Sequence, residues 1–337
     1  MSEIRLDRIH NQYVLIAPER LYRPNLSHTD KKKNTSSMCP FCEGNEDLTP
    51  PEVFAIRDNE ANLPSWKTRV VPNLYKAVQI ELEDVSKRDG MFESIPGVGA
   101  HEILIDSPCH DCDIVQLDAD ALENWLRSMI IRMEDLRKDK RLIHLSIFKN
   151  FGQNAGSTQD HPHTQILALP VMPKSELVFL DRNMTYYSRH GRGIIEDMIH
   201  NEMLAKKRIV SKIGDFIAFC PYASAYPFEV MIVPIVNISG LGRCTRKEIT
   251  DLSALIRIVF EKLSGQLGRF DYNLSFQMAP LNKNFENERY MESLDRNYRF
   301  SLRITPRIYN LGGFEISTGM AINSVVPEDC ARLLRGD

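Results

Sequence analysis

Residues 150–170, NFGQNAGSTQDHPHTQILALP, constrain this chain more than any other stretch. The apolar end, Ile166–Leu169, follows alternating residues, which predicts a β-strand. Side chains two positions apart on a strand share a face, so we expect His161, His163 and Gln165 on one face. A single histidine beside a strand is usually structural. Three polar groups together cannot be satisfied cheaply in a buried strand, and they predict a functional site.

A loop of small residues precedes the two histidines. Gly152, Gly156, Ser157 and Thr158 carry little side-chain bulk, so their backbone N–H groups can approach an anion closely. The loop and the histidines together predict a pocket of phosphate size.

Composition excludes several classes of protein. A chain of 337 residues with 43% apolar content can form one large or two ordinary domains. The net charge of -3 argues against a nucleic-acid-binding protein. No apolar run approaches the roughly 20 residues that span a bilayer, and the N-terminus lacks a signal-peptide core. We therefore expect a cytoplasmic protein with neither a nucleic acid nor a membrane as partner.

Four of the seven cysteines form two close pairs, in CPFC at 39–42 and in CHDC at 109–112. The odd number fits a reducing compartment better than a disulfide framework. Two cysteines at this spacing can bind one tetrahedral ion, with zinc as the expected metal. The remaining ligands are either the second cysteine pair or His110 with His161, and spacing alone leaves both sets open.

Three further polar residues are candidate nucleotide-binding groups. Arg20 and Arg23 follow a short predicted strand, Gln12–Ala17, and are either solvated charges or contacts to a phosphate or nucleobase. Asn73 lies in a loop-like Pro-Asn pair of a second predicted strand, Arg69–Val78.

The order of predicted elements indicates a duplicated α+β fold, with antiparallel sheets and helices packed across them. In the first half (1–175), strands surround an amphipathic helix at Asp118–Asp139. A helical connector (176–212) leads to a second half (213–337) with the helix Arg246–Leu267. There the segment YRFSLRITP takes the place of HPHTQILALP. We interpret the second half as a degenerate copy.

Four segments together resemble the galactose-1-phosphate uridylyltransferase family of the histidine-triad superfamily: CPFCEGNE, DSPCH, NFGQNAGSTQDHPHTQ and FIAFCPYASAYPFEVMIVP. The resemblance runs nearly end to end. It implies transfer of a nucleoside monophosphate through a covalent histidine intermediate, a histidine-triad-like fold in each half, and a homodimer. Its substrates would be a nucleotide sugar and a sugar phosphate or phosphate.

The resemblance also implies roles for individual residues. His163 would be the nucleophile, assisted by the side-chain amide of Gln165, while Asn150 holds ribose or phosphate. One structural Zn²⁺ would be held by four ligands, namely Cys39, Cys42, His110 and His161. Cys109 and Cys112 depart from the family pattern, and an ion held by either of them is the alternative.

The tail GGFEISTGMAINSVVPEDCARLLR resembles the ADP-glucose phosphorylase branch of this family. Glu315 matches a sugar-contacting glutamate of the uridylyltransferases, but their hexose-binding glutamine falls on Ala321. A second metal site of some relatives uses an H-x-H that is Ser301-Leu302-Arg303 in this chain, so we expect one ion. We predict either ADP-sugar phosphorolysis or uridylyl transfer to a hexose 1-phosphate. The alternative is a zinc-stabilised nucleotide-binding protein without turnover.

Overall fold

The computed structural model describes residues 2–22, 38–283 and 293–337. Arg23, one of the candidate nucleotide-binding residues, lies outside them. Within the described residues, no helix combines the length and the apolar character needed to cross a membrane.

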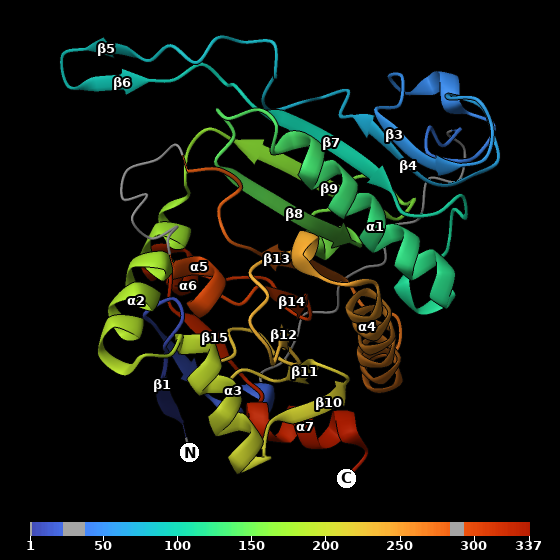
Figure 1. The fold of residues 1–337 in the computed structure, drawn as a ribbon. Helices are drawn as coiled ribbons and strands as arrows, with labels where there is room; N and C mark the ends of the chain where they lie inside the picture. Colours follow the sequence, from blue (N-terminus) through green and yellow to red (C-terminus); the bar gives the residue numbers. More distant parts are fainter. Residues whose placement is uncertain (1, 23–37, 284–292) are drawn as a thin grey trace.

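A ten-stranded antiparallel sheet forms the centre of the described part of the molecule (Figure 1). Its order is β10-β11-β12-β14-β13-β8-β9-β7-β4-β3. The strands from the first half are β3 (Phe54–Arg57), β4 (Trp66–Pro72), β7 (Ala100–Ile105), β8 (His144–Phe151) and β9 (His163–Leu169). Those from the second half are β10 (Ile209–Ile213), β11 (Phe216–Phe219), β12 (Val230–Pro234), β13 (Tyr272–Gln277) and β14 (Ser301–Pro306).

Each half contributes five strands with the same connectivity. In each, the first three strands are neighbours, a long helix follows, and the fifth strand pairs between the third and the fourth. The two copies meet where β8 pairs with β13, with Phe148 opposite Ser275. The α+β fold predicted from the order of elements is confirmed by this arrangement. On the same topology we propose two halves joined by a connector, with the start of the second half moved from residue 213 to Ile209, where β10 begins.

The two long helices, α1 (Ala119–Leu136) and α4 (Arg246–Leu267), share one face of the sheet. Their N-termini are capped because the Asp118 side chain accepts from Ala121 N, and Thr245 forms a capping box with Glu248. Buried residues of both helices, such as Trp125 and Leu255, belong to one hydrophobic core that contains strands of both halves. The halves are therefore packed as one body.

The opposite face of the sheet is covered differently in the two halves. In the second half, α2 (Lys174–His190) and α3 (Ile194–Ala205) pack a second core onto β11 and β12. In the first half a small cluster on β4 and β7 is covered by Phe41 from the CPFC turn. This face of the first half carries the site described below.

The smaller elements surround the central sheet. A three-stranded sheet joins β1 (Glu3–Asp7), β2 (Gln12–Ile16) and β15 (Ala321–Asn323), and β5 (Lys87–Asp89) with β6 (Phe92–Ser94) forms a projecting hairpin (Figure 1). The remaining helices are α5 (Leu294–Asn297), α6 (Gly313–Thr318) and α7 (Pro327–Arg335).

Two predicted boundaries are wrong. The strand predicted over Arg69–Val78 ends at Pro72, because the Asn73 side chain accepts from Tyr75 N and turns the chain. The predicted helical connector stops before Ile209, which begins β10 and pairs with β11. In both places, a local or tertiary partner overrides the periodicity of the sequence.

Candidate active site and metal site

Strand β9 presents two different faces. Trp125 Nε1 on α1 donates to Thr164 Oγ1 at 2.9 Å, and Ile166 lies in the core beneath that helix. His163 and Gln165 alternate with these residues and therefore face away from α1. His161 stands two residues earlier, before the first residue of the strand.

The His163 imidazole is held in one orientation. Its Nδ1 lies 2.9 Å from the backbone oxygen of His161, and only a protonated Nδ1 can donate there. Nε2 is therefore left with its lone pair. The ring is only 6% exposed, and this burial, with Lys149 nearby, lowers the pKa of His163. The ring of Phe41 contacts it edge-on, with the centroids 5.4 Å apart. A neutral, oriented imidazole can act as a nucleophile.

A buried ion pair lies on the opposite face of β9. Lys149 Nζ is 2.6 Å from Asp106 Oδ2, and both side chains are almost completely buried. Asp106 Oδ1 also accepts from Thr164 Oγ1 at 2.8 Å. Sequence analysis missed this pair, although in each of two predicted apolar strands, EILID and RLIHLSIFK, the final residue is charged. The pair fixes the start of β9 next to His163.

The small-residue loop is shaped by residues of the second half. Gly152 has a φ of +82°, and a Cβ on it would overlap the carboxylate of Asp271. That carboxylate accepts from Asn154 N at 2.8 Å. The side-chain amide of Asn273 donates to Asn150 Oδ1 at 2.8 Å and to the backbone oxygen of Ala155 at 2.9 Å. Nothing in the sequence pattern linked Asp271 or Asn273 to this loop.

Gln165 is oriented by a residue that sequence analysis also missed. Ala77 N donates to Nδ1 of His101, so the proton of this ring is on Nε2, which donates to Gln165 Oε1 at 3.0 Å. The amide nitrogen of Gln165 keeps its protons for another acceptor. Asn73 Nδ2 lies 3.1 Å from the same Nε2, but both atoms carry protons in this tautomer, so this contact is not a hydrogen bond. The sequence AHEILI carried a signal for this contact, because His101 shares a strand face with Ile103, which pairs with Gln165.

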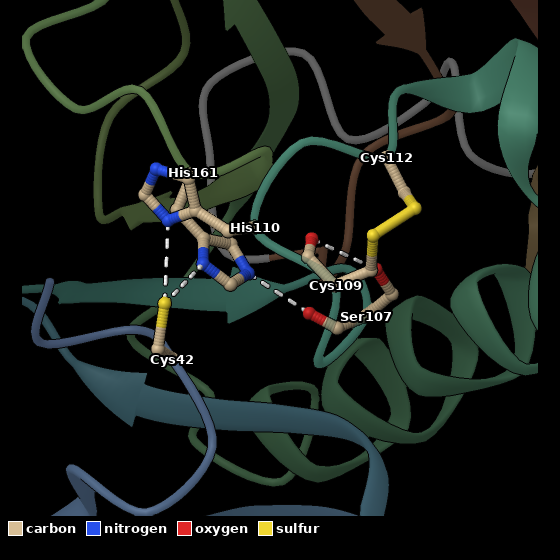
Figure 2. Close-up of a disulfide and its surroundings, with 6 residues drawn as sticks. All are labelled: Cys42, Ser107, Cys109, His110, Cys112 and His161. Carbon is tan, nitrogen blue, oxygen red and sulfur yellow. Dashed lines mark hydrogen bonds between the residues drawn. A yellow bond between two sulfur atoms is a disulfide. The ribbon is translucent and has the colours of Figure 1, made fainter.

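A cluster of four potential metal ligands lies beside His163. The ligand atoms of Cys39, Cys42, His110 and His161 are all within 4.8 Å of one another. His161 Nδ1 is 3.7 Å from each sulfur, and His110 Nδ1 is 3.3 Å from Cys42 Sγ. Nε2 of His161 donates to the backbone oxygen of Ser107 at 2.9 Å (Figure 2). This second hydrogen bond is typical of a metal-bound histidine, so the residues fit a tetrahedral ion.

The protonation states of the cluster depend on its burial. Desolvation raises the pKa of the Cys42 thiol to about 11 and lowers that of His161 to about 4. His161 is therefore neutral, as a metal ligand must be, while a bound cation would deprotonate the thiol.

The second cysteine pair is not part of the cluster. Cys109 and Cys112 are joined by a disulfide, with their Cα atoms 5.4 Å apart (Figure 2). The turn brings two cysteines three positions apart within bonding range. Because neither sulfur is available as a thiolate ligand, both the four-cysteine site and an ion held by Cys109 or Cys112 are wrong.

The remaining predicted residues have the following surroundings. Arg20 is exposed in a short 3₁₀ segment, and Glu315 Oε2 accepts from Gly312 N within α6. In the second half, Ser301 is buried and Arg303 pairs with Glu229 at 2.7 Å.

Comparison with known proteins gives matches over nearly the whole chain. Residues 1–173 match galactose-1-phosphate uridyl transferase, N-terminal domain, and residues 180–335 match its C-terminal domain. An ADP-glucose phosphorylase of Arabidopsis thaliana is 31% identical over 99% of this chain and 92% of its own. A galactose-1-phosphate uridylyltransferase of Thermotoga maritima is 24% identical over 99% of this chain and 98% of its own.

Among solved structures, an ADP-glucose phosphorylase from Arabidopsis thaliana with bound ADP-glucose superimposes with a TM-score of 0.85. The two chains are 30% identical, and the match covers 100% of this chain and 99% of the other.

Proposed function

This chain belongs to the galactose-1-phosphate uridylyltransferase family, and from that premise we propose that it is a nucleotidyltransferase acting through His163. Its donor is a nucleotide sugar, and its acceptor is inorganic phosphate or a sugar 1-phosphate. The observation that carries the proposal is the buried imidazole whose Nδ1 is occupied by the backbone oxygen of His161, which leaves Nε2 for attack.

The reaction proceeds by two displacements at the α-phosphorus. Nε2 of His163 attacks, the bond to the sugar 1-phosphate breaks, and that group leaves with the electron pair. The imidazole then carries a positive charge, which the hydrogen bond from Nδ1 to the backbone oxygen of His161 stabilises. In the second step the acceptor phosphate attacks phosphorus and the Nε2–P bond breaks.

Neutral hydrogen-bond donors for the phosphoryl oxygens lie near His163. The side-chain amide of Gln165 is oriented by His101, and Thr158 follows the loop that Asn273 holds. Within that loop, the N–H groups of Gly156 and Ser157 donate to the backbone oxygens of Gln153 and Gly152, so the anion cradle expected from these two residues is not formed by their amides. Donors fixed before the reaction lower the barrier because they need no reorganisation when negative charge develops. We propose that Asn150, whose Oδ1 accepts from Asn273 at the start of this loop, contacts ribose or phosphate.

Cys39, Cys42, His110 and His161 are proposed to hold one structural Zn²⁺. When bound, this ion supplies a cross-link between the CPFC turn, the CHDC turn and the start of β9. Four protein ligands leave no open coordination position, so its role is structural. Phe41, between the two cysteines, contacts the His163 ring, and the turn thereby positions the nucleophile.

We propose an adenine nucleotide sugar as the donor. The match to the ADP-glucose phosphorylase supports this choice, since it exceeds the match to the uridylyltransferase in identity at equal coverage of this chain. We also propose a homodimer. Phe314 and Ile316 are 41% and 74% exposed on α6, beside Glu315, and such apolar side chains suit a subunit interface. The alternative of a binding protein without turnover gains no support, because both named relatives are enzymes.

The covalent intermediate provides the test. The purified protein is incubated with ADP-glucose or UDP-glucose, without an acceptor, and its intact mass is measured. We expect an AMP adduct that is absent in His163→Asn and retained in His200→Asn, an exposed histidine on α3. A UMP adduct alone would reassign the base. Folded protein that forms no adduct with either donor would contradict the transferase and favour the binding protein.

A further inference from the structure

The CHDC turn encloses one of the proposed metal ligands in a covalent ring. His110 lies between Cys109 and Cys112, whose sulfurs are bonded to each other. His110 Nδ1 is 3.3 Å from Cys42 Sγ, so one residue of the covalent ring that the disulfide closes is also a member of the metal cluster. Neither the family pattern nor the proposed reaction uses this bond.

The turn also contacts a second ligand of the cluster. The backbone oxygen of Ser107 accepts from His161 Nε2 at 2.9 Å, and Ser107 Oγ donates to the backbone oxygen of Cys109 at 3.5 Å. The His110 and His161 rings meet edge-on, with centroids 5.3 Å apart. A change in the conformation of this turn therefore reaches both histidine ligands.

The two ends of the disulfide differ in access. Cys112 packs against the main hydrophobic core, and the next residue, Asp113, accepts from the buried Tyr272 hydroxyl. Cys109, by contrast, is exposed. One sulfur is thus anchored while the other can be reached by a thiol from solution, which is the arrangement that thiol–disulfide exchange requires.

We propose that Cys109–Cys112 is a thiol–disulfide exchange site whose oxidised form holds His110 for the metal. A thiolate of a low-molecular-weight dithiol attacks Cys109 Sγ, the S–S bond breaks, and Cys112 leaves as a thiolate that takes a proton. The second thiol of the reductant then displaces Cys109 as a thiol. One protein disulfide and one dithiol become two protein thiols and one oxidised reductant.

Reduction opens the four-residue ring and restores conformational freedom to His110. Fixing His110 on metal binding then costs more conformational entropy, so the affinity of the cluster for zinc falls. Changes in the groups that orient a metal ligand typically lower affinity by about 10- to 100-fold. We expect a loss of about tenfold, because three of the four ligands lie outside the ring. The inference depends on the metal site proposed above.

The test measures zinc on the full chain in both redox states. The zinc content of the oxidised protein is measured first. The affinity for zinc is then measured by competition with a chromogenic chelator, before and after reduction of the protein. The reductant is a phosphine, because it carries no thiols that would bind zinc. Alkylation followed by intact mass counts the free thiols. We expect two additional thiols after reduction and about tenfold weaker binding.

Two variants separate the disulfide from other effects of reduction. Cys109→Ser/Cys112→Ser is expected to bind zinc as weakly as the reduced protein, in both redox states. Cys244→Ser, which removes a half-buried free thiol outside the cluster, is expected to behave as the wild type. Equal or tighter zinc binding after reduction would overturn the inference while leaving the metal site intact. Oxidised protein that binds no zinc would overturn the metal site and this inference with it.

Discussion

Lys149 brings a full charge into the interior of the first half. Its ammonium is paired with Asp106 at 2.6 Å, and Asp106 accepts from Thr164 next to the proposed nucleophile. We predict that Lys149→Met lowers the free energy of unfolding by about 3–5 kcal/mol, because it leaves a buried carboxylate without its partner. Urea unfolding followed by circular dichroism measures this change.

Two variants control for the loss of the lysine side chain. Lys149→Met/Asp106→Asn removes both charges and keeps an acceptor for Thr164, so it should recover much of the lost stability. Lys138→Met breaks an exposed pair with Asp135 and should cost less than about 1 kcal/mol. If Lys149→Met lowers the free energy of unfolding no more than Lys138→Met does, the buried pair contributes little to stability.

At the level of single residues, sequence patterns identified groups that are close in the chain. The potential metal ligands on the CPFC turn and the histidines of HPH were identified from short spacings and from the family resemblance. Asn273 and Asp271 hold the small-residue loop from more than 100 positions away, and no periodicity reports such a contact. The disulfide was missed because cysteine counting indicates a compartment, whereas bonding depends on the distance between two Cα atoms.

At the level of elements, the loop between β8 and β9 depends on two glycines for different reasons. Both have a positive φ, but only Gly152 faces a neighbour, the carboxylate of Asp271, where a Cβ would lie. Gly156 has open space around that position. We predict that Gly156→Ala costs about 1–2 kcal/mol through its backbone alone.

Gly152→Ala should cost more and should also weaken nucleotide binding. Its methyl group must displace Asp271, and Asn154 N then loses its acceptor. We expect an additional loss of about 1–3 kcal/mol in unfolding free energy from that unsatisfied donor, and an increase in the Kd for ADP-glucose measured by calorimetry. Equal stabilities for the two alanine variants would show that the Asp271 contact does not shape the loop.

Element types were predicted better than element ends. The helix Arg246–Leu267 was located to the residue, because a capping box and an unbroken apolar stripe mark it in sequence. Strand β4 ended earlier than predicted because an Asx-type turn at Asn73 interrupts a run that still looks extended. Edge strands such as β3 and β10 were missed. Each pairs with the next strand along the chain, but a register shift in that pairing interrupts the alternation that would have marked it.

For the whole molecule, the repeated order of elements indicated a duplication, but not that both copies share one sheet and one core. The pairing of β8 with β13 and the joint packing of α1 with α4 join the halves, and the second half lends Asn273 to the site of the first. The second half, which contains no histidine from residue 213 onward, thus supports the small-residue loop of the first half.

This coupling predicts a single unfolding transition. Both tryptophans, Trp66 and Trp125, lie in the first half, so their fluorescence reports on that half while circular dichroism reports on the whole chain. Leu255→Ala in α4 creates a cavity in the shared core and should lower the unfolding free energy by about 2–5 kcal/mol by both probes. Arg257→Ala, on the exposed side of α4, should change it by about 0.5 kcal/mol or less. The opposite outcome is a fluorescence midpoint that stays at its wild-type value in Leu255→Ala while the circular dichroism midpoint shifts. It would mean that the halves unfold independently and that the shared core does not couple their unfolding.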